Sequence, residues 1–166
     1  MGGAEDVGAA ADFARAFDMA REAGLRLTSH AGEWGGAQSI WDTLEDLKVE
    51  RIGHGVQAID DPKLVDYLAE TGIVLEVNPG SNIALGVYAN LAQHPIAKLR
   101  DAGVKVTVST DDPPFFQTTM TKEFERLEQV FGWGVDDFNL LNKTALEAAF
   151  CDAGTKDLIA KRLETV

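Results

Sequence analysis

Polar and ionisable side chains occur at the ends of four short predicted strands of this 166-residue sequence. In chain order, His30 and Glu33 follow the first, His54 ends the second, Asn78 with Ser81 and Asn82 follows the third, and Asp111 with Asp112 follows the fourth. An Asp in such a place is often a helix cap or turn residue, and a lone His is often structural. Repetition after four successive strands is instead typical of an active site in a parallel α/β fold.

The residue types in this set favour a metal site. Imidazole and carboxylate groups are ligands for Zn²⁺ or a similar divalent ion, and a catalytic zinc keeps one position open for water. We expect His30 and Asp111 to be the ligands, and Glu33 to move protons in the same cavity. His94 precedes Pro95 at the start of a helix. We interpret it as a structural or capping residue away from the strand ends.

The elements that must position these residues follow one pattern, an amphipathic segment that stops at glycine and leads at once into an apolar run. The pattern occurs at Gly24, Gly72 and Gly103. Glycine just past a helix end takes the left-handed conformation, and short β-branched runs read as buried strands. We expect strands at 25–29, 51–55, 73–77 and 104–109, and helices at 7–23, 37–48, 62–71, 94–102, 121–131, 135–150 and 155–163.

Four successive strand and helix units fit either a doubly wound sheet or part of a (β/α)₈ barrel. A closed barrel of this type needs roughly 250 residues, so a chain of 166 residues is too short to form one alone. We expect a single partial domain over residues 1–166.

The composition of the chain disfavours several classes of protein function. The net charge of −12 leaves no basic surface for nucleic acid or anionic lipid. The sequence has no apolar run of the roughly 20 residues that a membrane span needs. Cys151 is the only cysteine, which suits a reducing compartment, and we interpret it as a small packed residue in a helix. A cytoplasmic protein without nucleic-acid or membrane partners is expected.

Four segments in order and spacing resemble the adenosine deaminase family. They are Ser-His30-Ala-Gly-Glu33, Arg-Ile-Gly-His54-Gly, Leu-Glu-Val-Asn-Pro-Gly-Ser-Asn82 and Ser-Thr-Asp111-Asp112-Pro. The tail Asn142-Lys-Thr-Ala-Leu-Glu-Ala-Ala-Phe150 is similar to the family's closing helix. The resemblance spans nearly the whole chain and implies the C-terminal half of a (β/α)₈ barrel of the TIM type, strands five to eight with their helices.

The resemblance also implies a role for each matching residue. His30 and Asp111 would bind Zn²⁺, and His54 would orient or deprotonate the attacking water. Glu33 would protonate N1 of the purine and Asp112 would hold N7. The backbone amide of Gly3 would contact N3. The implied reaction is hydrolytic deamination of adenosine to inosine and ammonia, as in purine salvage.

One departure from the family bears on activity. Family members carry a His-x-His pair on the first barrel strand that supplies two more zinc ligands, and this sequence has none. The resemblance therefore implies a fragment or truncated chain that lacks the first four strands. A half barrel has two open strand edges, so we expect self-association or pairing with a separate N-terminal half.

Two alternatives stay open. In the first, the substrate is adenine or another purine; a phosphate-bearing substrate is disfavoured by the acidity of the chain. In the second, the half barrel is catalytically inactive and only binds or associates, because two ligands do not make a catalytic zinc site. A zinc site of the cytidine deaminase type is excluded, since it needs a Cys-x-x-Cys pair and this sequence has a single cysteine.

Overall fold

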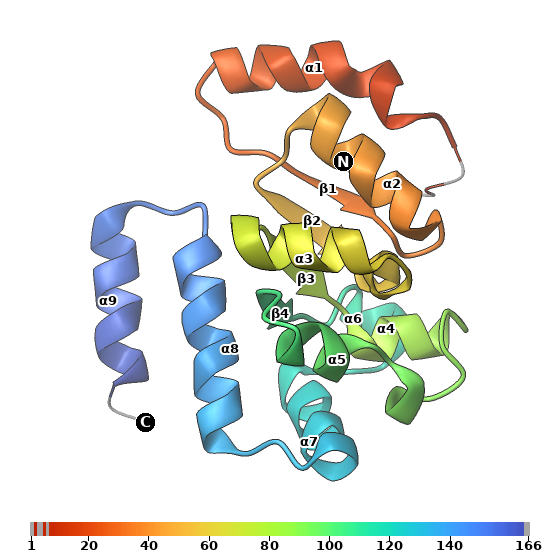
Figure 1. The fold of residues 1–166 in the computed structure, drawn as a ribbon. Helices are drawn as coiled ribbons and strands as arrows, with labels where there is room; N and C mark the ends of the chain where they lie inside the picture. The colour runs from red at the N-terminus through yellow and green to blue at the C-terminus, as the bar shows by residue number, and fades with distance from the viewer. Residues whose placement is uncertain (1, 3–4, 6, 165–166) are drawn as a thin grey trace.

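One parallel sheet organises the chain in the computed structural model, which describes residues 2, 5 and 7–164. Within these residues the sheet has four strands in the order β1-β2-β3-β4 (Figure 1). They are β1 (Thr28–Ala31), β2 (Arg51–His54), β3 (Val74–Val77) and β4 (Val106–Val108). A doubly wound sheet reverses its strand order at a switch point, whereas consecutive neighbours without reversal are the order of a (β/α)₈ barrel. The observed order therefore favours part of a barrel.

Helices follow each strand and complete the βα units. The α-helices are α1 (Ala10–Glu22), α2 (Gly36–Asp42), α3 (Pro62–Thr71), α4 (Pro79–Ala84), α5 (Ile96–Asp101), α6 (Pro113–Phe116), α7 (Met120–Phe131), α8 (Val135–Ala148) and α9 (Ala153–Leu163). Short turns are η1 (Thr43–Leu47), a π-helical continuation of α2, and the 3₁₀ turns η2 (Val56–Asp60) and η3 (Leu91–Gln93). In the described part of the chain, no helix combines the length and apolar character needed to cross a bilayer.

Helix α3 shows how the sequence sets these boundaries. The carboxylate of Asp61 accepts a hydrogen bond from the amide of Lys63, and Pro62 occupies the first helical position. Gly72 ends the helix with φ of 69°, and its amide donates to the carbonyl of Leu68. The helix therefore has the bounds that the sequence predicts, 62–71, with Gly72 just past its end.

The core lies between the sheet and the helices that cover one of its faces. Figure 1 shows α2 and α3 lying over the strands. Helices α8 and α9 lie beside each other at the left of that view. Ile40 of α2 and Leu68 of α3 are fully buried, as are Ile52 and Leu75 of the central strands. This packing fixes the strands, and with them the residues at their ends.

The first strand differs from the expectation. It begins at Thr28 rather than at residue 25, because the register pairs Thr28 with Arg51, the first residue of β2. Leu25 lies outside the sheet and is exposed. His30 is therefore a strand residue and does not follow the strand. The sequence also missed the short helices α4 and α6, each of which begins at a proline directly after a strand-end loop.

Candidate active site at the strand ends

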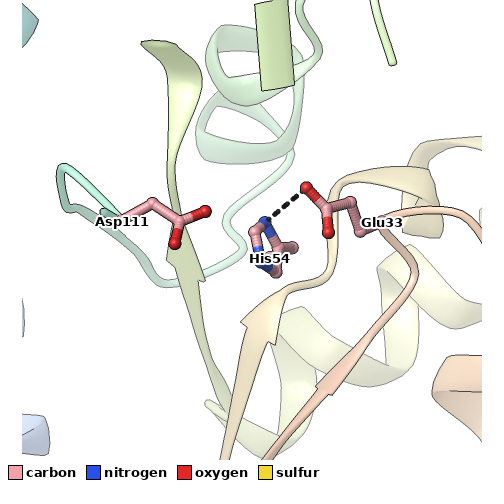
Figure 2. Close-up of side chains that lie close together, drawn as sticks. All are labelled: Glu33, His54 and Asp111. Carbon is pink, nitrogen blue, oxygen red and sulfur yellow. Dashed lines mark ion pairs between the residues drawn. The ribbon is translucent and has the colours of Figure 1, made fainter. Parts of the chain in front are cut away.

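Three ionisable side chains meet at the carboxyl ends of the strands. One ligand atom from each of Glu33, His54 and Asp111 lies within 4.8 Å of those of the other two. Figure 2 shows His54 between the carboxylates of Glu33 and Asp111, with Nδ1 of His54 3.4 Å from Oε1 of Glu33. Glu33 and His54 are buried. The sequence expected these residues in one cavity, and the fold brings them together.

The backbone at two of these positions is strained. His54 has φ of 64° and Asp111 has φ of 59°. Non-glycine residues rarely adopt this left-handed region, and they do so mostly where the surrounding structure forces them. Both positions carry side chains of the cluster, whose ligand atoms lie within 4.8 Å of one another.

Two buried asparagines surround the imidazole of His54. The Nδ2 atoms of Asn78 and Asn82 each lie 3.3 Å from Nδ1 of His54. Nδ2 of Asn82 also donates to Oε1 of Glu33 over 3.0 Å. Asn82 thus links the candidate acid to the candidate histidine.

Burial shifts the pKa values of the central pair in opposite directions. Desolvation, followed by the charges of Asp111 and Glu5, raises the pKa of Glu33 from 4.5 to about 7. Desolvation and the neighbouring His30 lower the pKa of His54 from 6.5 to about 4. Near neutral pH the carboxyl of Glu33 is therefore partly protonated while His54 is neutral. Such a pair suits proton transfer at neutral pH.

The loop that carries Glu33 is held by a residue that the sequence left without a role. Oε1 of Glu5 accepts from the amide of Glu33 over 2.9 Å. Oε2 of Glu5 accepts from the amides of Trp34 and Gly35 over 3.0 and 2.7 Å. A carboxylate that receives three backbone N–H groups fixes the loop firmly. An acidic residue after a glycine pair was the only signal in the sequence.

His30 lies beside this cluster. Its ring and that of His54 meet edge to face, with centroids 4.8 Å apart. The register places Gly53 beside His30, and a Cβ atom at Gly53 would lie only 2.5 Å from Cδ2 of that imidazole. The absence of a side chain at Gly53 is what gives the ring its place.

His30 and Asp111 also share a cavity of about 280 Å³. The hydroxyl of Ser81 donates to Oδ2 of Asp111 over 2.7 Å and so orients the carboxylate. Outer hydrogen bonds of this kind are usual around metal ligands. One imidazole and one oriented carboxylate on a shared cavity fit part of a zinc site, in which three protein ligands are usual.

Asp112 and Gly3 stand apart from the cluster. Asp112 is exposed, and its side chain makes no capping hydrogen bond to α6 among the described residues, so it is not the helix cap that its position before Pro113 allowed. Gly3 lies outside the residues that the structure describes. Their expected contacts with N7 and N3 of a purine stay predictions.

For His94 the expected capping contact is confirmed, but its expected distance from the strand ends is wrong. Its Nδ1 accepts from the amide of Ile96 over 3.2 Å, which is the expected capping contact. Its Nε2, however, lies 3.1 Å from Oδ1 of Asn82, so the residue is not remote from the strand ends. Cys151 was expected inside a helix but lies between α8 and α9, partly buried.

Two curated relatives illustrate the sequence similarity. The adenine deaminase of Rhizobium rhizogenes is 54% identical over 163 residues, a match that covers 98% of this chain and 51% of that protein. The adenine deaminase of Agrobacterium fabrum is 52% identical, with 98% and 50% covered. The chain therefore spans about half the length of the curated relatives it matches.

Solved structures also match nearly the whole of this chain and about half of their own length. The adenine deaminase of Arthrobacter aurescens superposes with a TM-score of 0.94 at 32% identity, covering 99% of this chain and 50% of that one. An amidohydrolase from Burkhoderia ambifaria with bound Zn gives a TM-score of 0.84 at 28% identity, again with 99% and 50% covered. These matches confirm the expectation of an α/β half barrel.

A family model described as adenosine deaminase matches residues 1–166, the whole chain. That match agrees with the relatives, with the solved structures and with the resemblance of the four strand-end segments. The chain belongs to the adenosine deaminase family.

Proposed function

We propose that this chain supplies the proton-transfer residues and part of the metal site of a zinc-dependent hydrolase that removes the amino group of a purine. The observation that supports this most is the meeting of Glu33, His54 and Asp111 at the strand ends, with the pKa of Glu33 raised to about 7. A carboxyl group held near neutrality can act as an acid toward a weakly basic ring nitrogen.

The metal would be held by His30 and Asp111 from this chain. When bound, zinc supplies a water whose pKa is lowered to about 7, and hence a nucleophile at neutral pH. Ser81 would keep Asp111 oriented, as its 2.7 Å hydrogen bond supports. The remaining ligands would come from outside these residues.

Glu33, His54 and Asp112 would handle the purine and the water. Protonated Glu33 gives its proton to N1, which makes C6 more electrophilic, and His54 orients the water that adds there. One proton of the water restores Glu33 and the other leaves with the amino group as the bond from C6 to nitrogen breaks. The oxygen stays on C6 and ammonia departs. Asp112 would contact N7, and the amide of Gly3 would contact N3.

Adenine is the favoured substrate. The curated relatives at 54% and 52% identity are named adenine deaminase, and so is the solved protein from Arthrobacter aurescens. These names favour the adenine alternative over adenosine. The net charge of −12 further disfavours a substrate that carries phosphate.

The second candidate is a half barrel without activity of its own. Two observations favour it for the isolated chain: only His30 and Asp111 are assigned as ligands here, and the matches cover about half of the relatives. A catalytic zinc usually needs three protein ligands. The two candidates differ in whether a completing half restores turnover.

The test is to coexpress this chain with the unmatched half of the Rhizobium rhizogenes adenine deaminase and to assay deamination. We expect adenine to be converted to hypoxanthine, adenosine to react more slowly, and zinc to copurify with the complex. Glu33→Gln, which keeps the size of the side chain, should abolish turnover. An assembled, zinc-loaded complex that deaminates neither purine would contradict the proposed function.

A further inference from the structure

His94 is buried in the loop before α5, and its hydrogen bonds define which ring nitrogen carries a proton. The residue is 2% exposed, and Nδ1 lies 3.2 Å from the backbone N–H of Ile96. A backbone N–H can only donate, so Nδ1 must present its lone pair. The hydrogen of the neutral ring is therefore on Nε2. Burial, which lowers the pKa of His94 to about 4, keeps the ring neutral near pH 7.

The protonated Nε2 in turn fixes the amide of Asn82. Nε2 lies 3.1 Å from Oδ1 of Asn82, and a donor at that place requires the oxygen of the amide to face it. Oxygen and nitrogen of an asparagine amide are assigned from such hydrogen-bond logic. Asn82 is 0% exposed, so water does not offer its amide an alternative partner.

The NH₂ group of Asn82 then faces the candidate site. Its nitrogen lies 3.0 Å from Oε1 of Glu33 and 3.3 Å from Nδ1 of His54. Oε1 of Glu33 and Nδ1 of His54 lie 3.4 Å apart, and both are acceptors in this arrangement. Asn82 is thus a donor that links the two atoms, while Nδ2 of Asn78 also lies 3.3 Å from Nδ1 of His54.

We propose that His94 is a positioning residue of the deamination site, which through Asn82 directs an NH₂ group at Glu33 and His54. The inference has two consequences. The proton of the Glu33 acid resides on Oε2, the oxygen that Asn82 leaves free. Nδ1 of His54, which faces the NH₂ group, presents its lone pair, so the ring hydrogen of His54 resides on Nε2. The catalytic part of this inference rests on the proposed function; the proton positions do not.

The proton positions can be tested on the 166-residue chain itself. It has three histidines, so ¹⁵N NMR of the imidazoles yields three ring systems to assign. We expect the ring hydrogen on Nε2 in both His94 and His54, with Nδ1 of each ring acting as an acceptor. Hydrogen on Nδ1 of His94, or fast averaging between its two neutral forms, would overturn the inference.

Variants of His94 separate positioning from packing. His94→Phe keeps a ring but loses both hydrogen bonds. Because Nδ2 of Asn78 also lies 3.3 Å from Nδ1 of His54, the variant is made in an Asn78→Ala chain, where it should let the ring of His54 average over its two neutral forms. His94→Gln keeps a donor toward Asn82 and should restore part of the single form. Tyr88→Phe is the matched control, because Tyr88 packs against the His94 ring with centroids 5.1 Å apart. If His94→Phe fails to fold, a spectrum of His94→Gln in which His54 averages fully would count against the inference.

The catalytic consequence is measured in the complex with the completing half. His94→Phe should lower kcat about 10-fold to 100-fold, the usual effect of losing an outer-shell partner, with KM nearly unchanged. Parental kcat in His94→Phe would overturn the positioning role. If the NMR spectra are as expected but the unsubstituted complex does not deaminate, the proposed function fails while the assigned proton positions stand.

Discussion

Nδ1 of His54 lies 3.4 Å from Oε1 of Glu33, and the two residues reach this contact from the ends of neighbouring strands. His54 is the last residue of β2, while Glu33 follows β1 and is held by Glu5. Because a single amide, that of Asn82, donates to both atoms, the contact is stable with an uncharged imidazole. The pKa shift of Glu33 leads to the first prediction, and that of His94, which contacts Asn82, leads to the second.

Glu33→Gln should stabilise the chain above neutral pH. The pKa of Glu33 is raised from 4.5 to about 7, so the folded state holds this proton while the unfolded state loses it. The destabilisation of the fold by this group therefore grows as pH rises from about 4.5 to about 7, and it stays at its largest value above that pH. Removing it should raise the free energy of unfolding by about 1–3 kcal/mol at pH 8. Urea unfolding at pH 5 and pH 8 measures this, and an equal gain at both would contradict it.

His94→Gln should reduce the acid sensitivity of the fold. The pKa of His94 is lowered from 6.5 to about 4, so stability from this group is complete above pH 6.5 and is lost as pH falls toward 4. The variant should be less stable than the parent at pH 7, with the difference shrinking toward pH 4.5. Thermal melting across this range checks the slope. A constant difference would mean that His94 does not stay neutral in the fold.

Much of the site was predictable from sequence, since strand ends of a parallel sheet share one edge. Glu33, His54 and Asp111 follow apolar runs that read plainly as strands. The link from His94 to Asn82 was not predictable, because the two residues are 12 positions apart in the sequence and only packing decides that they meet. The same holds for Glu5 and the loop of Glu33, whose hydrogen bonds span 28 residues. The start of β1 was misplaced because apolar content does not indicate register.

Gly53→Ala should displace the imidazole of His30. A Cβ atom there would lie 2.5 Å from Cδ2 of His30, a distance that real contacts do not show. We expect a loss of about 1–3 kcal/mol in stability and a shift of the His30 ring resonances. Gly134→Ala is the control, since a Cβ at Gly134 would meet nothing within 4 Å. Unchanged His30 resonances in Gly53→Ala would show that the ring is not displaced and would contradict this account.

Glu123→Ala should loosen the loops after β3 and β4 together. The buried carboxylate accepts from the amide of Gly80 over 2.8 Å, from Nη1 of Arg126 over 3.1 Å and from the hydroxyl of Thr118. Leaving these donors unpaired should cost about 3 kcal/mol or more. Hydrogen exchange should then speed up in residues 78–82 and 109–118. Glu125→Ala, an exposed position on the same helix, should leave the stability and the hydrogen exchange unchanged. Equal behaviour of the two variants would contradict the role of Glu123 in holding the two loops.

The sheet should promote association of the chain. Within the described residues β1 and β4 each pair on one side only, so each leaves an edge open. Open edges of parallel strands readily pair with another chain. Sedimentation of the 166-residue chain should show self-association that coexpression with a completing half suppresses. A well-behaved monomer over a wide concentration range would argue against pairing at these edges.

The most direct measurement is the ultraviolet absorbance of adenine incubated with this chain, the unmatched half of the Rhizobium rhizogenes enzyme, and zinc. The matched half of that enzyme, in place of this chain, is the positive control. We predict conversion to hypoxanthine that is lost in Glu33→Gln. No conversion by the assembled complex, while the control converts adenine, would contradict the assignment of these strand-end residues to purine deamination.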